Sequence, residues 1–325
     1  MNYVFADVLK YNNSPFKKLS TIGLAITKSI DDLITDSAAA ATAIATGYRT
    51  KNRYLSVDTS YNNLYTIFEH AEKLGLSTGV VVTDEVVGAT PAAFVTHYHS
   101  RSERREIARQ FLDIDLDVVI GGGAKYFLLA DSRHLDEEEM SLVDELKSKG
   151  YNFYYDFKEL TESVSSDKVF ALLADDALLE ADKREYSLGE LTSIALKHLA
   201  ANDKGFLLMI EGSQIDWAGH DKEPDYLLSE MDDFSNALKV VLKFAEKEGN
   251  TLVIVTSDHE TGGMAVTQGS YDGASLRIEF INSYHTAGFV GVFAYGPGEK
   301  LFGGIYDNYF MGRKIFHLLD ESYKF

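Results

Sequence analysis

The chain has 325 residues, 45% of them hydrophobic and 25% charged, which is ordinary for a globular protein able to bury a full core. Its net charge of −19 excludes the basic footprint of a nucleic-acid-binding protein, and any phosphate site must bring its own positive charge. The absence of cysteine excludes disulfides, thiolate zinc sites and cysteine nucleophiles. No apolar run reaches the ~18–20 residues that span a bilayer, and the first residues lack the pattern of a signal peptide.

An Ala-rich segment between Asp36 and Gly47 predicts a helix that begins near Ser37. The first turn of a helix offers unpaired N–H groups and a partial positive charge, which favour an oxyanion or a phosphate. Ser37 is therefore placed where a hydroxyl could act as a nucleophile. The alternative is that Ser37 or Asp36 only caps the helix.

Six short apolar runs predict strands, and the helical patterns between them predict helices. Because the runs are continuous rather than alternating, the strands should be covered on both faces, as in a mostly parallel sheet. We expect an α/β fold, a three-layer α/β/α sandwich in one domain over residues 1–325. The acidic run 136–139 should begin an exposed helix. In chain order the elements are helix Tyr61–Leu74, strand Thr78–Thr83, helix Ser102–Leu112, strands Asp117–Ile120 and Val169–Ala174, helix Leu188–Ala201, strand Phe206–Ile210, helix Asp225–Gly249 and strands Thr251–Thr256 and Gly291–Tyr295.

Metal-ligating side chains follow these predicted strands. Glu211 ends one strand, and Asp216 and His220 come four residues apart, on one face of a helical turn. Asp258 and His259 follow the next strand, and His285 precedes the last one. Functional residues of open α/β sheets gather beyond the carboxyl ends of strands. Carboxylate and imidazole ligands without sulfur suit a catalytic zinc, whereas a Glu–Thr–water set would suit magnesium.

Together these residues resemble the alkaline phosphatase family, most closely its small, cold-adapted bacterial members. His285 follows His259 closely, so the large crown insertion of bigger relatives should be nearly absent. The likeness spans most of the chain and rests on four blocks: Thr35–Gly47; Ala89–Ala93 with Ser100 and Arg101; Glu211–His220; and Thr256–Gly263 with His285.

The resemblance implies a metal-dependent phosphomonoesterase that works through a phosphoserine on Ser37. It implies one zinc on Asp216, His220 and His285 and a second on Asp258, His259 and Ser37. It also implies a magnesium to which Glu211 and Thr90 contribute, and a phosphate clamp formed by Arg101. These roles fit the chemistry, because phosphoryl transfer needs charge neutralisation and an in-line arrangement. The resemblance further implies small phosphomonoester substrates, a homodimer, and a periplasmic or secreted location.

The sequence departs from the family pattern in three ways: one expected strand and two residue types. Relatives have a first strand that ends in Asp-Gly-x-Gly, and its Asp bridges the second zinc and the magnesium. Here we expect that strand to be missing, with unpaired backbone groups left in the sheet and Asp7 a poor substitute for the ligand. Gly88 stands where relatives often carry Asp or His, and should leave that shell to water. Trp217 stands where some relatives carry Lys or His near the phosphate.

Three functions remain open at this point. A broad phosphomonoesterase is the first, and a phosphodiesterase or sulfatase-like enzyme on the same fold is the second. Ser37 argues against the second, because those enzymes usually carry Thr or a modified Cys. The third is a metal-binding remnant whose catalysis is impaired because the N-terminal Asp ligand is absent.

Overall fold

The computed structural model describes residues 2–11, 13–128, 141–164 and 168–324. The acidic run 136–139, expected to begin a helix, lies outside the described residues. The helices are α1 Asn2–Lys10, α2 Ser37–Thr46, α3 Ile67–Leu74, α4 Ala89–Val95, α5 Arg104–Gln110, α6 Leu142–Ser148, α7 Phe157–Thr161, α8 Leu188–Leu199, α9 Gln214–Asp221, α10 Pro224–Glu248 and α11 Tyr309–Leu319. The strands are β1 Thr21–Ile26, β2 Ser77–Glu85, β3 Val118–Gly122, β4 Tyr151–Tyr154, β5 Lys168–Leu172, β6 Phe206–Glu211, β7 Val253–Val255, β8 Glu260–Thr261, β9 Ala265–Gly269, β10 Leu276–Glu279, β11 His285–Thr286, β12 Val290–Tyr295 and β13 Gly304–Asp307.

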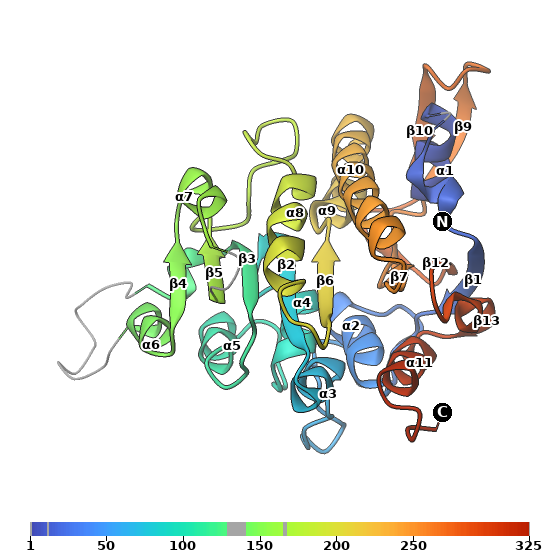
Figure 1. Ribbon diagram of the computed structural model, residues 1–325. Coiled ribbons are helices and arrows are strands. Elements are labelled where there is room, and N and C mark those ends of the chain that lie inside the picture. The colour runs from blue at the N-terminus through green and yellow to red at the C-terminus, as the bar shows by residue number, and fades with distance from the viewer. Residues whose placement is uncertain (1, 12, 129–140, 165–167, 325) are drawn as a thin grey trace.

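A parallel sheet with the order β4-β5-β3-β2-β6 lies at the centre of the fold (Figure 1). Successive residues of β2 face opposite helix layers, since Val80 and Val82 pack with residues of α3 and α5 and Val81 packs with residues of α8. Burial on both faces explains the continuous apolar runs. The predicted α/β fold is confirmed, and all six predicted strands and four predicted helices are present. The largest difference in bounds is at the helix predicted from Tyr61, which begins at Ile67 because Thr66 caps it.

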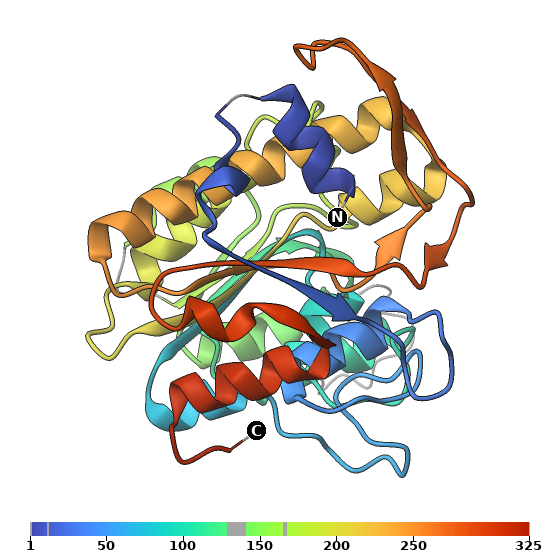
Figure 2. The same cartoon turned by 90° about the vertical axis from the view of Figure 1, so that its right-hand side faces the viewer.

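A second sheet, β13-β1-β12-β7, continues the fold beyond β6. Here β12 pairs antiparallel with both β1 and β7, and β13 pairs parallel with β1. Figure 2 shows α10 and α1 on one side of this sheet and α2 and α11 on the other. In place of a large crown, the hairpin β9–β10 connects the segments that carry His259 and His285.

The two sheets do not join. In the described part of the chain β6 pairs only with β2, and β7 pairs only with β12. A cavity of about 380 Å³ lies between them, lined by residues 207–211 on one side and by residues 252 and 254–256 on the other. The edges of β6 and β7 that border this cavity have no strand partner in the described part of the chain, in keeping with the expected loss of strand pairing. Asp7 lies elsewhere, buried and bonded to the Ser14 hydroxyl.

Among the described residues, no helix combines the length and the apolar character needed to cross a membrane.

Candidate metal and phosphate site

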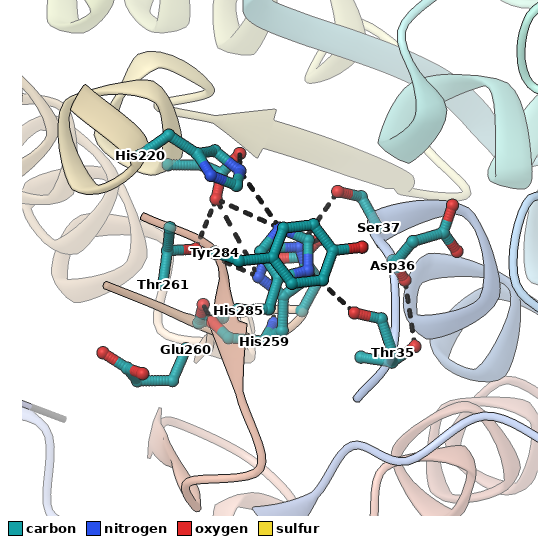
Figure 3. A network of polar contacts seen from close by, with 12 residues as sticks. Thr35, Asp36, Ser37, His220, His259, Glu260, Thr261, Tyr284 and His285 are labelled. Carbon is teal, nitrogen blue, oxygen red and sulfur yellow. Dashed lines mark hydrogen bonds and ion pairs between the residues drawn. The ribbon is translucent and has the colours of Figure 1, made fainter. Parts of the chain in front are cut away.

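Helix α2 begins at Ser37, and Asp36 is its N-cap. The Asp36 Oδ1 atom accepts a hydrogen bond from the Ala39 N–H at 3.0 Å, while Gly47 ends the helix with a left-handed backbone. Because Asp36 performs the capping, the Ser37 hydroxyl is free to project from the first turn. Its Oγ lies 3.0 Å from His259 Nε2 (Figure 3). The capping alternative thus holds for Asp36 and not for Ser37.

The strongest candidate metal site joins Asp216, His220 and His285. One ligand atom from each lies within 4.8 Å of the others. Helix α9 places Asp216 and His220 one turn apart, and His285 reaches the same point from β11. His220 Nε2 is 3.2 Å from His285 Nε2 and 3.3 Å from Asp216 Oδ2.

Backbone carbonyls orient both imidazoles. The Nδ1 atom of His285 lies 2.7 Å from the Thr35 carbonyl, and that of His220 lies 2.8 Å from the Ser283 carbonyl. A carbonyl can only accept, so Nδ1 donates in each case and Nε2 is left to bind a metal. Two imidazole nitrogens and a carboxylate converging in this way fit a zinc ion.

Asp258, His259 and Ser37 form a second group. The turn after β7 brings His259 Nε2 to 3.1 Å from Asp258 Oδ2, although neighbouring side chains usually point apart. His259 stacks on His285 with ring centres 3.5 Å apart, and its Nδ1 lies 3.9 Å from Asp216 Oδ1. The two groups are thus in direct contact, as two adjacent metal sites would require.

Charge inside this cluster is strongly coupled. A hydrogen bond to Asp216 raises the pKa of His220 to about 9. Burial opposes ionisation of Asp216, yet contacts with His220, His259 and Thr261 hold the pKa of that carboxyl well below its usual range. The His259 pKa is raised, because the neighbouring Asp258 and Asp216 carboxylates outweigh the effect of its burial. The cluster therefore favours positive charge at its centre.

Oxygen-bearing side chains gather at the end of β6 and the start of α4. Glu211 Oε2 accepts from the Ser213 hydroxyl at 2.6 Å, and the Thr90 side chain also bonds to this carboxylate. Burial raises the pKa of Glu211 to about 7 and that of Asp84 to about 6. A set of carboxylate and hydroxyl oxygens fits magnesium better than zinc.

Arg101 places a positive charge beside Ser37 and the cap of α2. Its Nη1 donates to Asp36 Oδ2 at 3.1 Å. It lines the same cavity as Ser37, and so does Trp217, which is 37% exposed.

Seven of the nine site residues predicted from the sequence line this cavity, and the other two, His220 and His285, lie beside Asp216. Four further neighbours of the site were not identified from the sequence. Thr261 donates to Asp216 Oδ1, Tyr284 stacks on His285, and Ser213 and Asp84 lie beside Glu211. Thr261 lies inside the block Thr256–Gly263, so the motif itself could have pointed to it. Ser213 likewise lies inside the block Glu211–His220, whereas Asp84 and Tyr284 lie outside the four blocks.

A sequence model described as alkaline phosphatase matches residues 7–278. The chain belongs to the alkaline phosphatase family. It is 40% identical over 256 residues to alkaline phosphatase 3 of Bacillus subtilis, covering 76% of this chain and 54% of that relative. The chain thus spans about half the length of the Bacillus subtilis relatives it matches.

Solved structures of cold-adapted bacterial enzymes are similar over almost the whole chain. The alkaline phosphatase of the Antarctic bacterium TAB5 has a TM-score of 0.90 and 34% identity, covering 98% of this chain and 94% of that one. The cold-active enzyme of a psychrophilic Shewanella has a TM-score of 0.88 and 31% identity, covering 98% and 96%. A variant of the TAB5 enzyme has been solved with Mg bound in its M3 site. The predicted likeness to small cold-adapted members is confirmed.

Proposed function

We propose that this chain hydrolyses phosphate monoesters through a phosphoserine on Ser37. The observation that carries the proposal is the Ser37 hydroxyl at the first turn of α2, 3.0 Å from His259 and beside the Asp216–His220–His285 cluster. Family membership supports the same reaction.

Three metal positions are part of this proposal. Asp216, His220 and His285 would hold one zinc; Asp258, His259 and Ser37 would hold a second; Glu211 and Thr90 would contribute to a magnesium. When bound, the ions supply positive charge for the phosphoryl group and lower the pKa of the serine hydroxyl and of water.

The residues of the chain provide binding and geometry. The free N–H groups of the first turn of α2 and the planar guanidinium of Arg101 bind the phosphate oxygens. Ser37 Oγ forms a bond to phosphorus as the bond to the alcohol oxygen breaks, and the serine proton leaves with the alcohol. Water then attacks phosphorus, restores the serine hydroxyl and releases inorganic phosphate. These residues would contact only the phosphoryl group and not the alcohol, which supports the hydrolysis of a broad range of small phosphomonoesters.

The test is hydrolysis of p-nitrophenyl phosphate by the purified chain, with and without a chelator and with zinc added back. Activity should be lost with chelator, recover with zinc, and fall at least about 1000-fold in Ser37→Ala, because the nucleophile is gone. The control is Ser148→Ala, which alters an exposed serine at the end of α6. Activity that survives Ser37→Ala would contradict the phosphoserine route.

A second candidate is a metal-binding protein with impaired catalysis. It is favoured by the Asp258–His259–Ser37 group, which includes one carboxylate among the described residues and lies beside the open gap between β6 and β7. Folded protein that binds zinc but does not turn over the ester would support this reading.

The family resemblance also leads us to propose a homodimer that works in the periplasm or outside the cell. Light scattering on the purified protein would test the dimer, and a mass of one chain at micromolar concentration would contradict it.

A further inference from the structure

Asp84 lies at the carboxyl end of β2, next to the oxygen ligands of the site. Its backbone N–H donates to the Ser213 hydroxyl at 3.2 Å, and that hydroxyl donates to Glu211 Oε2 at 2.6 Å. One serine therefore connects the end of β2 to the end of β6. Asp84 also lines the cavity that contains Ser37, Thr90 and Arg101.

The Asp84 carboxylate occupies the space that a side chain at position 88 would need. A Cβ atom added to Gly88 would lie 2.9 Å from Asp84 Oδ2 and 2.9 Å from the Glu85 carbonyl oxygen. Gly88 has φ −57°, which any residue can adopt, so its backbone does not require glycine. The expectation that Gly88 leaves this shell to water stays a prediction, but a carboxylate from the end of β2 lies beside this position.

The neighbouring carboxylate of Glu85 forms close ion pairs, whereas Asp84 feels the charges of Arg104 and Arg101 only from a longer distance. Glu85 lies 3.0 Å from Lys125 Nζ and 3.8 Å from Arg104 Nε. The Asp84 Oδ1 atom accepts from the Glu85 N–H at 2.6 Å, and no ion pair within 4.0 Å involves Asp84 among the described residues. Two carboxylates, Asp84 and Glu211, thus face one small region with the Thr90 hydroxyl. This donor set suits a hard divalent cation and repels itself without one.

We propose that Asp84 is a ligand of the magnesium site, supplying from β2 the carboxylate that Gly88 cannot provide. The inference rests on the proposed function for the presence of that site, but it concerns cation binding and does not require turnover. Asp84 would bind the ion directly or through a bound water.

The test is calorimetric titration of Mg²⁺ into zinc-loaded protein, without substrate, for the unaltered chain and for Asp84→Asn. The amide keeps the shape of the side chain and removes its charge, and the bond from the Asp84 backbone to Ser213 remains. Mg²⁺ affinity should fall at least about 10-fold, because a hard cation loses a charged ligand. Zinc content should not change.

Glu85→Gln is the matched control, since it removes the adjacent carboxylate and should leave Mg²⁺ affinity within about twofold. Thermal melting without Mg²⁺ should occur at a temperature no lower for Asp84→Asn than for the unaltered chain, because the amide removes the repulsion between Asp84 and Glu211, and this separates ligand loss from misfolding. Equal Mg²⁺ affinity in the Asp84→Asn protein would overturn the proposal. So would an equal loss in Glu85→Gln, or an unaltered chain that binds no Mg²⁺ at millimolar concentration. Failure of ester hydrolysis alone would bear on the proposed function and not on Asp84.

Discussion

Strands β2 and β6 are neighbours that share a largely apolar character but differ in their surroundings. Both are continuous apolar runs in parallel register, with Val81 opposite Ile210. β2 pairs with β3 and β6, and nearly all of its residues are buried. β6 pairs only with β2 among the described residues, and each of its six residues is only partly buried. A run of this kind is typical of a strand covered on all sides, so β6 has the sequence of an interior strand at a sheet edge.

Amide hydrogen exchange should show the largest difference between the two strands. In a parallel strand successive N–H groups point to alternate sides, so every second amide of β6 faces the gap. These amides should exchange at least about 100-fold faster than those of β2, because no strand partner protects them. Two-dimensional NMR would measure this, with the β2-facing amides of β6 as the internal control. Uniform protection along β6 would show that the gap is closed in solution.

Truncating the paired residues Val81 and Ile210 should give a smaller difference between the two strands, measured as loss of folding stability. Val81 is fully buried, and Val81→Ala should lower the free energy of unfolding by about 2 kcal/mol, through lost burial and a new cavity. Ile210→Ala removes more atoms, yet should lower it by only about 1 kcal/mol because Ile210 is partly exposed and borders a cavity already. Urea unfolding would measure both, and a larger loss for Ile210→Ala would break the comparison.

Enlarging one side chain in each strand should give the smallest difference in stability between the two strands. A Cβ at Gly79 of β2 would lie 3.1 Å from Leu199 and from the Val118 carbonyl, so Gly79→Ala should destabilise by about 1 kcal/mol. Met209→Phe in β6 should change stability by less than about 0.5 kcal/mol, since the cavity beside it has room for the ring. Similar losses for both changes, again by urea unfolding, would mean that β6 is packed as tightly as β2.

These strands also mark what the sequence could predict. Apolar runs such as 78–83 and 206–210 predicted strands of the right type and place, because burial on both faces leaves a one-dimensional pattern. The pattern cannot tell whether a neighbour is present, so the division into two sheets came only from the structure. The expectation of unpaired groups came from the family resemblance and not from periodicity.

The site shows the same division. Ser37, Asp216 and His259 were identifiable because their spacing after strands and their motifs point to metal chemistry. Asp84 was not, because its proposed role depends on the approach of its carboxylate to Gly88 and on a hydroxyl from residue 213. Such a contact joins residues far apart in the chain, and composition or spacing carries no trace of it.

The Asp36 carboxylate couples the start of helix α2 to the position of Arg101. One oxygen of its carboxylate accepts from Ala39 and Arg53, and the other accepts from Arg101. The start of α2, the loop at Arg53 and the guanidinium are therefore held by a single group. An anion that draws Arg101 away must compete with the helix cap, and a change that loosens the cap alters the resting position of Arg101. If a bound anion stabilises the ordered turn by a given free energy, the ordered turn strengthens anion binding by the same free energy.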